Sequence, residues 1–427
     1  MKGKKIVSTL LALLLLASMP VSALAAEWDI SKGDITVNAG SGGQTVTQGS
    51  QVDVPDSAPV ITGSSTENTL TINAEKDQTA NVTLSGVNID VRDKGKAAVS
   101  TTGEGNVSIE LNGGSTLRSG YEHAGLEKNN GGSLTIADED KNGKLTAWGG
   151  QQGAGIGGGS GKDGSNIFIT GGGVNAIGGL AAAGIGGGLG GNGSNITISG
   201  GKVGATNGLN GAGIGGGQHG SGSNITISGG EVNAIGGKNG AGIGGGHTGD
   251  GSDITISGGE VNATGGTSGA GIGGGYNGNG SDITITNGEV NATGGKYGAG
   301  IGGGEYGIGK DIIITGGEVN ATGGRFSAGI GGGSRGTGSD ITISGGEVSA
   351  SGGVNGAGIG GGLRSKGKDI TVSGDTKLKV QGGDEDHYDG AGAGIGDGGS
   401  NAYGTKILGA EVEPDTSGLT TNGSIAY

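Results

Sequence analysis

Residues 253–282 read DITISGGEVNATGGTSGAGIGGGYNGNGSD, and this stretch decides the fold. It contains three short segments, ITIS, EVNA and GAGI, in which apolar and polar residues alternate as they do in a β-strand with one buried face. Glycine pairs separate the segments, and glycine supplies the positive φ angles that tight corners need. The stretch therefore predicts three strands with glycine corners, and it turns Ile254, Ile256, Val261, Ala263, Ala270 and Ile272 to one side.

The same pattern recurs at a fixed interval. The isoleucine of GAGIGGG, or of a close variant, advances in seven consecutive steps of 29 residues from Ile156 to Ile359, and an eighth step of 36 residues leads to Ile395. So strict a period indicates a solenoid in which each unit stacks on copies of itself. The sequence thus predicts an all-β parallel β-helix with 29-residue coils and three short strands per coil. A right-handed winding is favoured, as for other parallel crossover connections.

Composition excludes the main alternatives. Glycine accounts for 115 of the 427 residues, only 31% are hydrophobic and 3% are aromatic, so one large globular core of the usual kind cannot form. Collagen is excluded because glycine does not recur at every third residue. An α-helical fold is excluded because each glycine costs about 1 kcal/mol in a helix and no apolar stripe with a period of 3.6 residues occurs. Bundled polyproline II helices are an alternative for a glycine-rich chain, but the segments ITIS and EVNA favour strands.

The regions outside the strict repeat have separate predicted roles. Residues 1–25 resemble a secretory signal peptide, with Lys2, Lys4 and Lys5 before an apolar run and an A-x-A site at 23–25. We expect an N-terminal β cap and first irregular coils at 26–95, degenerate coils at 96–155, regular repeats at 156–398 and a C-terminal cap at 399–427. The mature chain is expected to be secreted, and its lack of cysteine means that it is stable without disulfides.

The net charge limits the classes of binding partner that the sequence predicts. The formal charge of −14 disfavours nucleic acid and anionic membranes. No second apolar run of about 20 residues follows the signal peptide, so no membrane association is expected after its cleavage. A monomer is expected.

Two aromatic residues define the candidate ligand site. Tyr297 and Phe326 each lie four residues before the repeat isoleucine, so they are 29 residues apart on adjacent coils, and Lys296 and Arg325 precede them. Two stacked rings beside two cations would suit a sugar ring with an anionic substituent. The variable loop after GAGIGGG carries further aromatic and basic residues, which fit either a recognition surface or neutral drift: His219, His247, Tyr276, Tyr306, Arg335 and Arg364.

Acidic residues form the candidate metal site. Glu260 and Asp253 recur at the 29-residue interval and would stack in two columns, either as a solvated face or around hydrated cations. The insertion DEDHYD gathers Asp384, Glu385, Asp386 and Asp389 in one loop, which is the best single site for a cation, with Ca²⁺ the candidate ion. A solvated loop is the alternative, and no other cofactor is expected.

No catalytic residues are assigned. The four histidines occupy unrelated positions in their coils, and no Ser-His-Asp set, HExxH motif or Walker loop occurs. The chain is therefore predicted not to be an enzyme. A polysaccharide lyase remains the enzymatic alternative.

The segments GAGIGGG, ITISGGEVNATGG and WDISKGDITV resemble the glycine-rich β-helix repeat proteins that Gram-positive bacteria export, over most of residues 27–400. The resemblance implies a pectin-lyase type of fold and a carbohydrate-binding or adhesin-like role. We therefore predict a secreted, non-catalytic β-helix that binds a polysaccharide or another cell-surface glycan. The alternative is a structural surface-coat or spacer element without a specific ligand.

Overall fold

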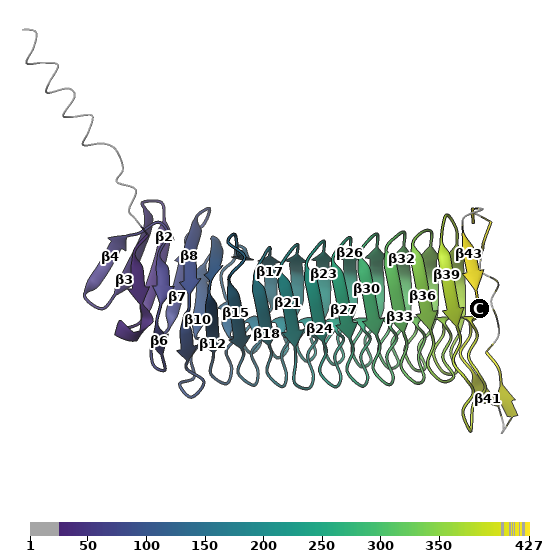
Figure 1. The fold of residues 1–427 in the computed structure, drawn as a ribbon. Coiled ribbons are helices and arrows are strands. Elements are labelled where there is room, and N and C mark those ends of the chain that lie inside the picture. Colours follow the sequence, from purple (N-terminus) through teal and green to yellow (C-terminus); the bar gives the residue numbers. More distant parts are fainter. Residues whose placement is uncertain are drawn as a thin grey trace, which may run out of the picture.

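The chain winds into a rod of stacked coils, from β1 (Glu27–Asp29) at one end to β43 (Ser424–Ala426) at the other (Figure 1). The computed structural model describes residues 25–402, 405–409, 411, 413, 415–417, 419–420 and 423–427. The predicted signal peptide lies outside these residues apart from Ala25. Within them the chain forms one short 3-10 helix, η1 (Ile30–Lys32), and no α-helix. None of the helical structure there is long and apolar enough to span a membrane.

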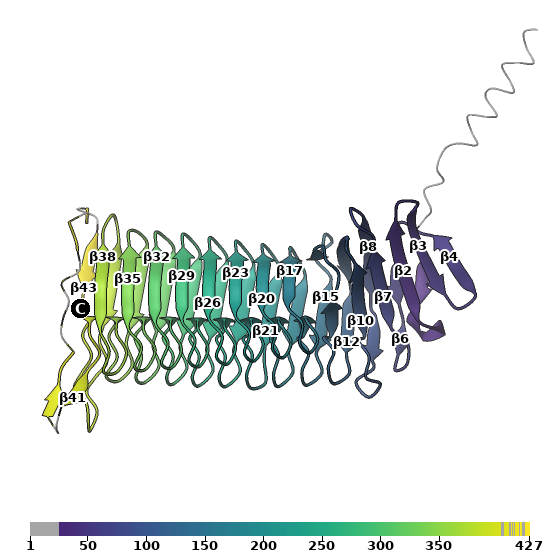
Figure 2. The same ribbon diagram turned by 180° about the vertical axis from the view of Figure 1, so that it is seen from behind.

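Three long sheets, here named A, B and C, form the sides of the rod. Each regular coil contributes one strand to each sheet, in the chain order A, C, B. Sheet A consists of β1, β5 (Val60–Thr62), β8 (Thr79–Ser85), β11 (Asn106–Asn112), β14 (Leu134–Ala137), β17 (Gly164–Ile169), β20 (Gly193–Ile198), β23 (Gly222–Ile227), β26 (Gly251–Ile256), β29 (Gly280–Ile285), β32 (Gly309–Ile314), β35 (Gly338–Ile343) and β38 (Gly367–Val372). Figure 2 looks onto this sheet.

Sheets C and B complete each coil. Sheet C consists of β6 (Ser64–Ser65), β9 (Asn88–Asp90), β12 (Gly114–Arg118), β15 (Lys144–Trp148), β18 (Gly173–Ile177), β21 (Lys202–Thr206), β24 (Glu231–Ile235), β27 (Glu260–Thr264), β30 (Glu289–Thr293), β33 (Glu318–Thr322), β36 (Glu347–Ser351), β39 (Lys377–Gln381) and β43. Sheet B consists of β4 (Gln51–Pro55), β3 (Gly43–Gln48), β2 (Ile35–Gly40), β7 (Leu70–Ala74), β10 (Val99–Gly103), β13 (Leu126–Lys128), β16 (Ile156–Gly157), β19 (Ile185–Gly186), β22 (Ile214–Gly215), β25 (Ile243–Gly244), β28 (Ile272–Gly273), β31 (Ile301–Gly302), β34 (Ile330–Gly331), β37 (Ile359–Gly360) and β40 (Ile395–Gly396).

Residues 29 apart pair directly across neighbouring coils, which confirms the predicted parallel β-helix. Ile254 pairs with Ile283, Val261 with Val290, and Ile272 with Ile301. The inward residues of the quoted repeat are at most 1% exposed. All of them except Ala270 join one contiguous core along the rod, so the columns of Ile, Val and Ala hold the coils together by apolar burial.

The GAGI segment differs from its prediction as a full strand. Only Ile272 and Gly273 form β28, and Ala270 is buried but lies outside the contiguous core. The reason is a local hydrogen bond, because the Ala270 N–H donates to the Gly274 carbonyl of its own coil at 2.9 Å. The residues before β28 therefore belong to a loop that folds beside the core.

The two ends of the rod depart from the regular coil. At the N-terminal end β3 and β4 extend sheet B as antiparallel strands beyond β2. At the C-terminal end β43 pairs with β39, and a short hairpin of β41 (Ser400–Ala402) and β42 (Thr405–Ile407) follows the last coil. The domain boundaries proposed from the sequence stay predictions.

Candidate ligand-binding site

The aspartate column of sheet A has a conformational role. Asp253 and Asp282 have φ angles of 52° and 53°, and the pairing of β26 with β29 skips both residues. Asparagine and aspartate tolerate this left-handed conformation better than other residues with a side chain. The same backbone conformation explains why asparagine occupies the equivalent positions Asn166, Asn195 and Asn224 of the earlier coils.

A second polar column connects the loops before sheet A. In each step a side-chain oxygen accepts a hydrogen bond from the backbone N–H of the next coil. The acceptors, with distances from 2.7 to 3.2 Å, are Asp163, Asn192, Ser221, Asp250 and Asn279. Asp250 therefore satisfies a backbone donor, the Asn279 N–H.

The outer face of sheet C carries a column of asparagines and a column of glutamates, which also make contacts between coils. The Asn291 amide donates to Asn262 at 3.0 Å, and the Asn320 amide donates to Asn291 at 3.1 Å. The glutamate column ends at Lys202, which forms an ion pair of 2.6 Å with Glu231. The asparagine hydrogen bonds and this one ion pair stabilise the stacking of the coils.

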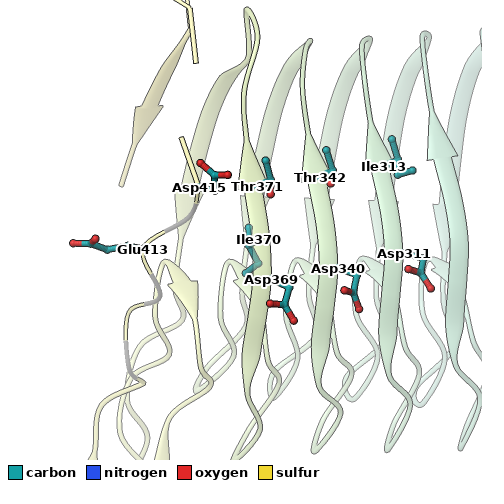
Figure 3. Close-up of a pocket in the computed structure, with 9 residues that line it drawn as sticks. All are labelled: Asp311, Ile313, Asp340, Thr342, Asp369, Ile370, Thr371, Glu413 and Asp415. Carbon is teal, nitrogen blue, oxygen red and sulfur yellow. The ribbon is translucent and has the colours of Figure 1, made fainter. Parts of the chain in front are cut away.

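An acidic groove of about 650 Å³ lies at the C-terminal end of sheet A. Asp311, Asp340 and Asp369 line it from successive strands, and Glu413 and Asp415 approach from the C-terminal segment (Figure 3). In the part of the chain that the structure describes, no three His, Asp or Glu side chains come together as a metal site would require. The groove therefore gives no support to a metal centre.

The acidic insertion does not gather its carboxylates either. Asp389 accepts two hydrogen bonds from Arg364, at 2.9 and 3.1 Å, and Glu385 pairs with Lys406 at 3.0 Å. Burial opposes ionisation of Asp386, but the backbone N–H groups of Asp389 and Tyr388 hold the pKa of its carboxyl below the ordinary value. Asp384 contributes its carbonyl to the Asn355 N–H. Ca²⁺ binding by this loop stays a prediction.

The structure brings together all four residues of the candidate ligand site. The rings of Tyr297 and Phe326 stack with centroids 5.9 Å apart and planes inclined by 11°. Lys296 Nζ lies 4.9 Å from the centroid of the Tyr297 ring, and Arg325 Cζ lies 4.9 Å from that of Phe326. Both rings are half-buried and both cations are exposed.

These four residues lie in the loops that lead from sheet C to sheet B, which we name the CB loops. The loops that lead from sheet B to the next strand of sheet A, the BA loops, carry a second file of rings on successive coils. The ring centroids are 5.4 Å apart from His219 to His247, 5.3 Å from His247 to Tyr276 and 5.9 Å from Tyr276 to Tyr306. Arg335 continues the file, with its Cζ 5.6 Å from the centroid of the Tyr306 ring.

His247 is a half-buried ring of this file. Its Nδ1 is buried and has no hydrogen-bond partner within the described residues. Burial and the neighbouring charge of His219 lower the pKa of His247. A neutral imidazole therefore stacks on Tyr276 at neutral pH.

The two rows of loops form one surface. The Ser334 N–H donates to the Tyr297 carbonyl at 2.9 Å. The Ser268 hydroxyl donates to Glu305 at 2.8 Å, so side chains of the two rows are in contact. We name this surface the aromatic face and define it by the residues His219, His247, Tyr276, Lys296, Tyr297, Tyr306, Arg325, Phe326 and Arg335.

The cations of the aromatic face form no close contact with a carboxylate among the described residues, although the charge of Arg325 acts on Asp386 from a greater distance. Lys296, Arg325 and Arg335 take part in no ion pair within the residues that the structure describes. Their charges therefore stay available, although the protein as a whole is acidic.

Sequence reasoning missed a pocket at the start of the regular coils. The pocket, of about 440 Å³, is lined by Arg92, Asp93, Arg118, Ser119, Tyr121, Trp148, Gly149, Gly150 and Gln151. Arg118 and Trp148 pair across β12 and β15. The sequence did contain a sign of this contact. Arg118 lies eight residues before Leu126, Trp148 lies eight residues before Ile156, and Leu126 pairs with Ile156. The interval there is 30 residues, outside the strict period.

Comparisons with known proteins agree with the observed coils. A family model described as "Beta helix repeat" matches residues 141–160, 196–218, 225–247, 254–276, 283–305, 312–334 and 341–363. No curated protein and no solved structure matches the chain. The stacked coils and the matched repeats together define a β-helix protein.

Proposed function

We propose that this chain is a secreted, non-catalytic β-helix protein that binds carbohydrate along the aromatic face. The observation that carries the proposal is the stacked pair Tyr297–Phe326 with unpaired cations above both rings. Aromatic rings bind the apolar faces of sugar rings, and cations pair with anionic substituents or hydroxyl groups.

The dimensions of the repeat favour a polymer over a small ligand. Coils are spaced by about 4.8 Å, close to the length of one β-1,4-linked hexopyranose, so that successive sugars can meet equivalent loops. Rings or exposed apolar groups occur on many CB and BA loops. Leu180 and Leu209, in CB loops, are 52% and 40% exposed. Most of the polar columns elsewhere are explained by hydrogen bonds or backbone conformation, and these exposed groups are not.

A glycan array probed with residues 26–427, with and without a chelator, tests the proposal. We expect binding to at least one polysaccharide, and the chelator arm decides whether Ca²⁺ takes part. The double variant Tyr297→Ala/Phe326→Ala should weaken binding by about tenfold to a hundredfold, as expected for the loss of two stacking contacts. The matched control is Thr255→Ala/Thr284→Ala, a pair of the same spacing on sheet A, which should bind like the parent protein.

Two results would count against this function. If no plant, microbial or host glycan is bound, the chain is better regarded as a structural coat or spacer. If uronic-acid polymers yield an unsaturated product that absorbs in the ultraviolet, the chain is a lyase and the non-catalytic assignment is wrong.

A further inference from the structure

The pocket around Arg118 and Trp148 contains an unused guanidinium. Arg118 Cζ lies 4.2 Å from the centroid of the Trp148 ring, which holds the side chain in place. Its nearest carboxylate oxygen, Asp90 Oδ2, is 3.9 Å from Nη1, too far for a hydrogen bond. Arg118 Nε is buried and has no partner in the described part of the chain. A guanidinium has five N–H donors, so an unpaired one beside a pocket needs an explanation.

Asp90 does not serve as that partner because Arg92 occupies it. Arg92 donates to both oxygens of Asp90, from Nε at 2.8 Å and from Nη2. The hydrogen bonds from Arg92 hold the pKa of the Asp90 carboxyl below its ordinary value, so the carboxyl is ionised and already paired. Arg118 acts on Asp90 only through its charge, from 3.9 Å, and its guanidinium forms no hydrogen bond with that carboxylate.

The remaining walls of the pocket suit a polar ring. Tyr121 is 52% exposed and offers an aromatic surface, and the half-buried indole of Trp148 adds an apolar edge. Asp93 also lines the pocket and can accept hydrogen bonds from hydroxyl groups. A planar guanidinium pairs best with a carboxylate, to which it can donate two parallel hydrogen bonds.

We propose that this pocket binds one carboxylate-bearing sugar unit, with the carboxylate on Arg118 and the sugar ring against Tyr121. The inference rests on the proposed carbohydrate-binding function and identifies an acidic sugar as part of its ligand. Gln151 of the pocket occupies the same CB-loop position as Lys296, five 29-residue steps further on, which is a span of about 24 Å. One acidic polymer can therefore engage the pocket and the aromatic face together.

The indole N–H signals in a proton–nitrogen NMR spectrum give a local readout, because the sequence contains only Trp28 and Trp148. Trp148→Phe assigns the two signals. The probes are methyl glucuronate, uncharged methyl glucoside and cyclohexanecarboxylate. We expect methyl glucuronate to shift the Trp148 signal with millimolar affinity and the other two probes to bind more weakly. Arg118→Gln should weaken glucuronate binding at least about tenfold, and Arg118→Lys should weaken it less.

Lys144→Gln is the matched control, since Lys144 is an exposed cation on the same strand as Trp148, and it should leave the titration unchanged. Equal affinity for the glucoside would overturn the role of the carboxylate, and equal affinity for cyclohexanecarboxylate would overturn the sugar. The absence of any shift at tens of millimolar glucuronate would overturn the site. If Arg118→Gln has no effect while Tyr297→Ala/Phe326→Ala abolishes polymer binding, this inference fails and the proposed function stands.

Discussion

Lys128 provides the clearest energetic prediction. Its side chain is only 5% exposed, and its Nζ donates to the Asn130 carbonyl at 2.6 Å. Burial lowers the pKa of Lys128 from 10.5 to about 8. Between these two pH values the unfolded chain binds more protons than the folded chain, so the free energy of unfolding rises with pH. Below pH 8 both states are protonated and the cost of burying the charge is complete.

The size of the effect follows from the pKa values. Lowering the pKa from 10.5 to about 8 corresponds to a loss of roughly 3 kcal/mol in the free energy of unfolding. This loss disappears only when the pH exceeds the pKa of Lys128 in the unfolded chain. Between pH 7.5 and 9.5 the free energy of unfolding should therefore increase by about 2 kcal/mol more in the parent protein than in Lys128→Met. Contributions that do not depend on pH, such as the lost hydrogen bond to Asn130, cancel in this difference.

Urea unfolding at the two pH values, followed by tryptophan fluorescence, measures this difference. Trp28 and Trp148 both lie in the N-terminal part of the rod, so they report on the coils around Lys128 even if distant repeats unfold separately. Lys144→Met, which removes an exposed lysine, should behave like the parent protein. If the free energy of unfolding changes equally for Lys128→Met and the parent protein between pH 7.5 and 9.5, burial does not lower the pKa of Lys128.

Three further predictions concern the regular coils. Gly244 has a φ of 128°, and a Cβ there would lie 2.1 Å from the Gly273 carbonyl oxygen, so Gly244→Ala should lower the free energy of unfolding by more than about 3 kcal/mol. Gly114→Ala, where an added Cβ meets nothing within 4 Å, should be nearly neutral in the same urea titration. Asp282→Asn should change stability by less than about 0.5 kcal/mol, whereas Asp282→Val should cost about 1–2 kcal/mol because valine resists a φ of 53°; similar melting of the two variants would contradict this. His247 should titrate below 6.5 in an NMR pH series, and the folded protein should lose stability as the pH falls below that value; a pKa at or above 6.5 would show that the ring is not enclosed.

The fold and the aromatic pair could be predicted because both depend on the constant interval. Once residues 29 apart are placed side by side, Tyr297 lies beside Phe326, and the alternation of apolar and polar residues gives the inward position of Ile254. The sequence alone also located the second file of rings in the BA loops. It could not show that His247 and Tyr276 are in contact, because loop conformation decides this.

Other features depend on information that the interval does not carry. The role of Asp253 comes from its φ angle, which a residue type suggests but does not determine. Two carboxylates of the insertion, Asp389 and Glu385, pair with Arg364 and Lys406, which approach from other segments. The contact of Arg118 with Trp148 lies where the interval is 30 residues. In each case a tertiary contact or a backbone angle decides what the side chain does.

All proposed surfaces require that each 29-residue step advances the chain by one strand spacing. Double electron–electron resonance measures the distance between two nitroxide labels and therefore tests this advance directly. The protein has no cysteine, so labels can be attached specifically at Thr197→Cys with Thr342→Cys and at Thr197→Cys with Thr371→Cys, five and six steps apart in one column of sheet A. We predict narrow distributions centred near 24 and 29 Å, which differ by about 4.8 Å. Broad distributions, or two distances that do not differ by one strand spacing, would contradict the stacked coils and every surface built on them.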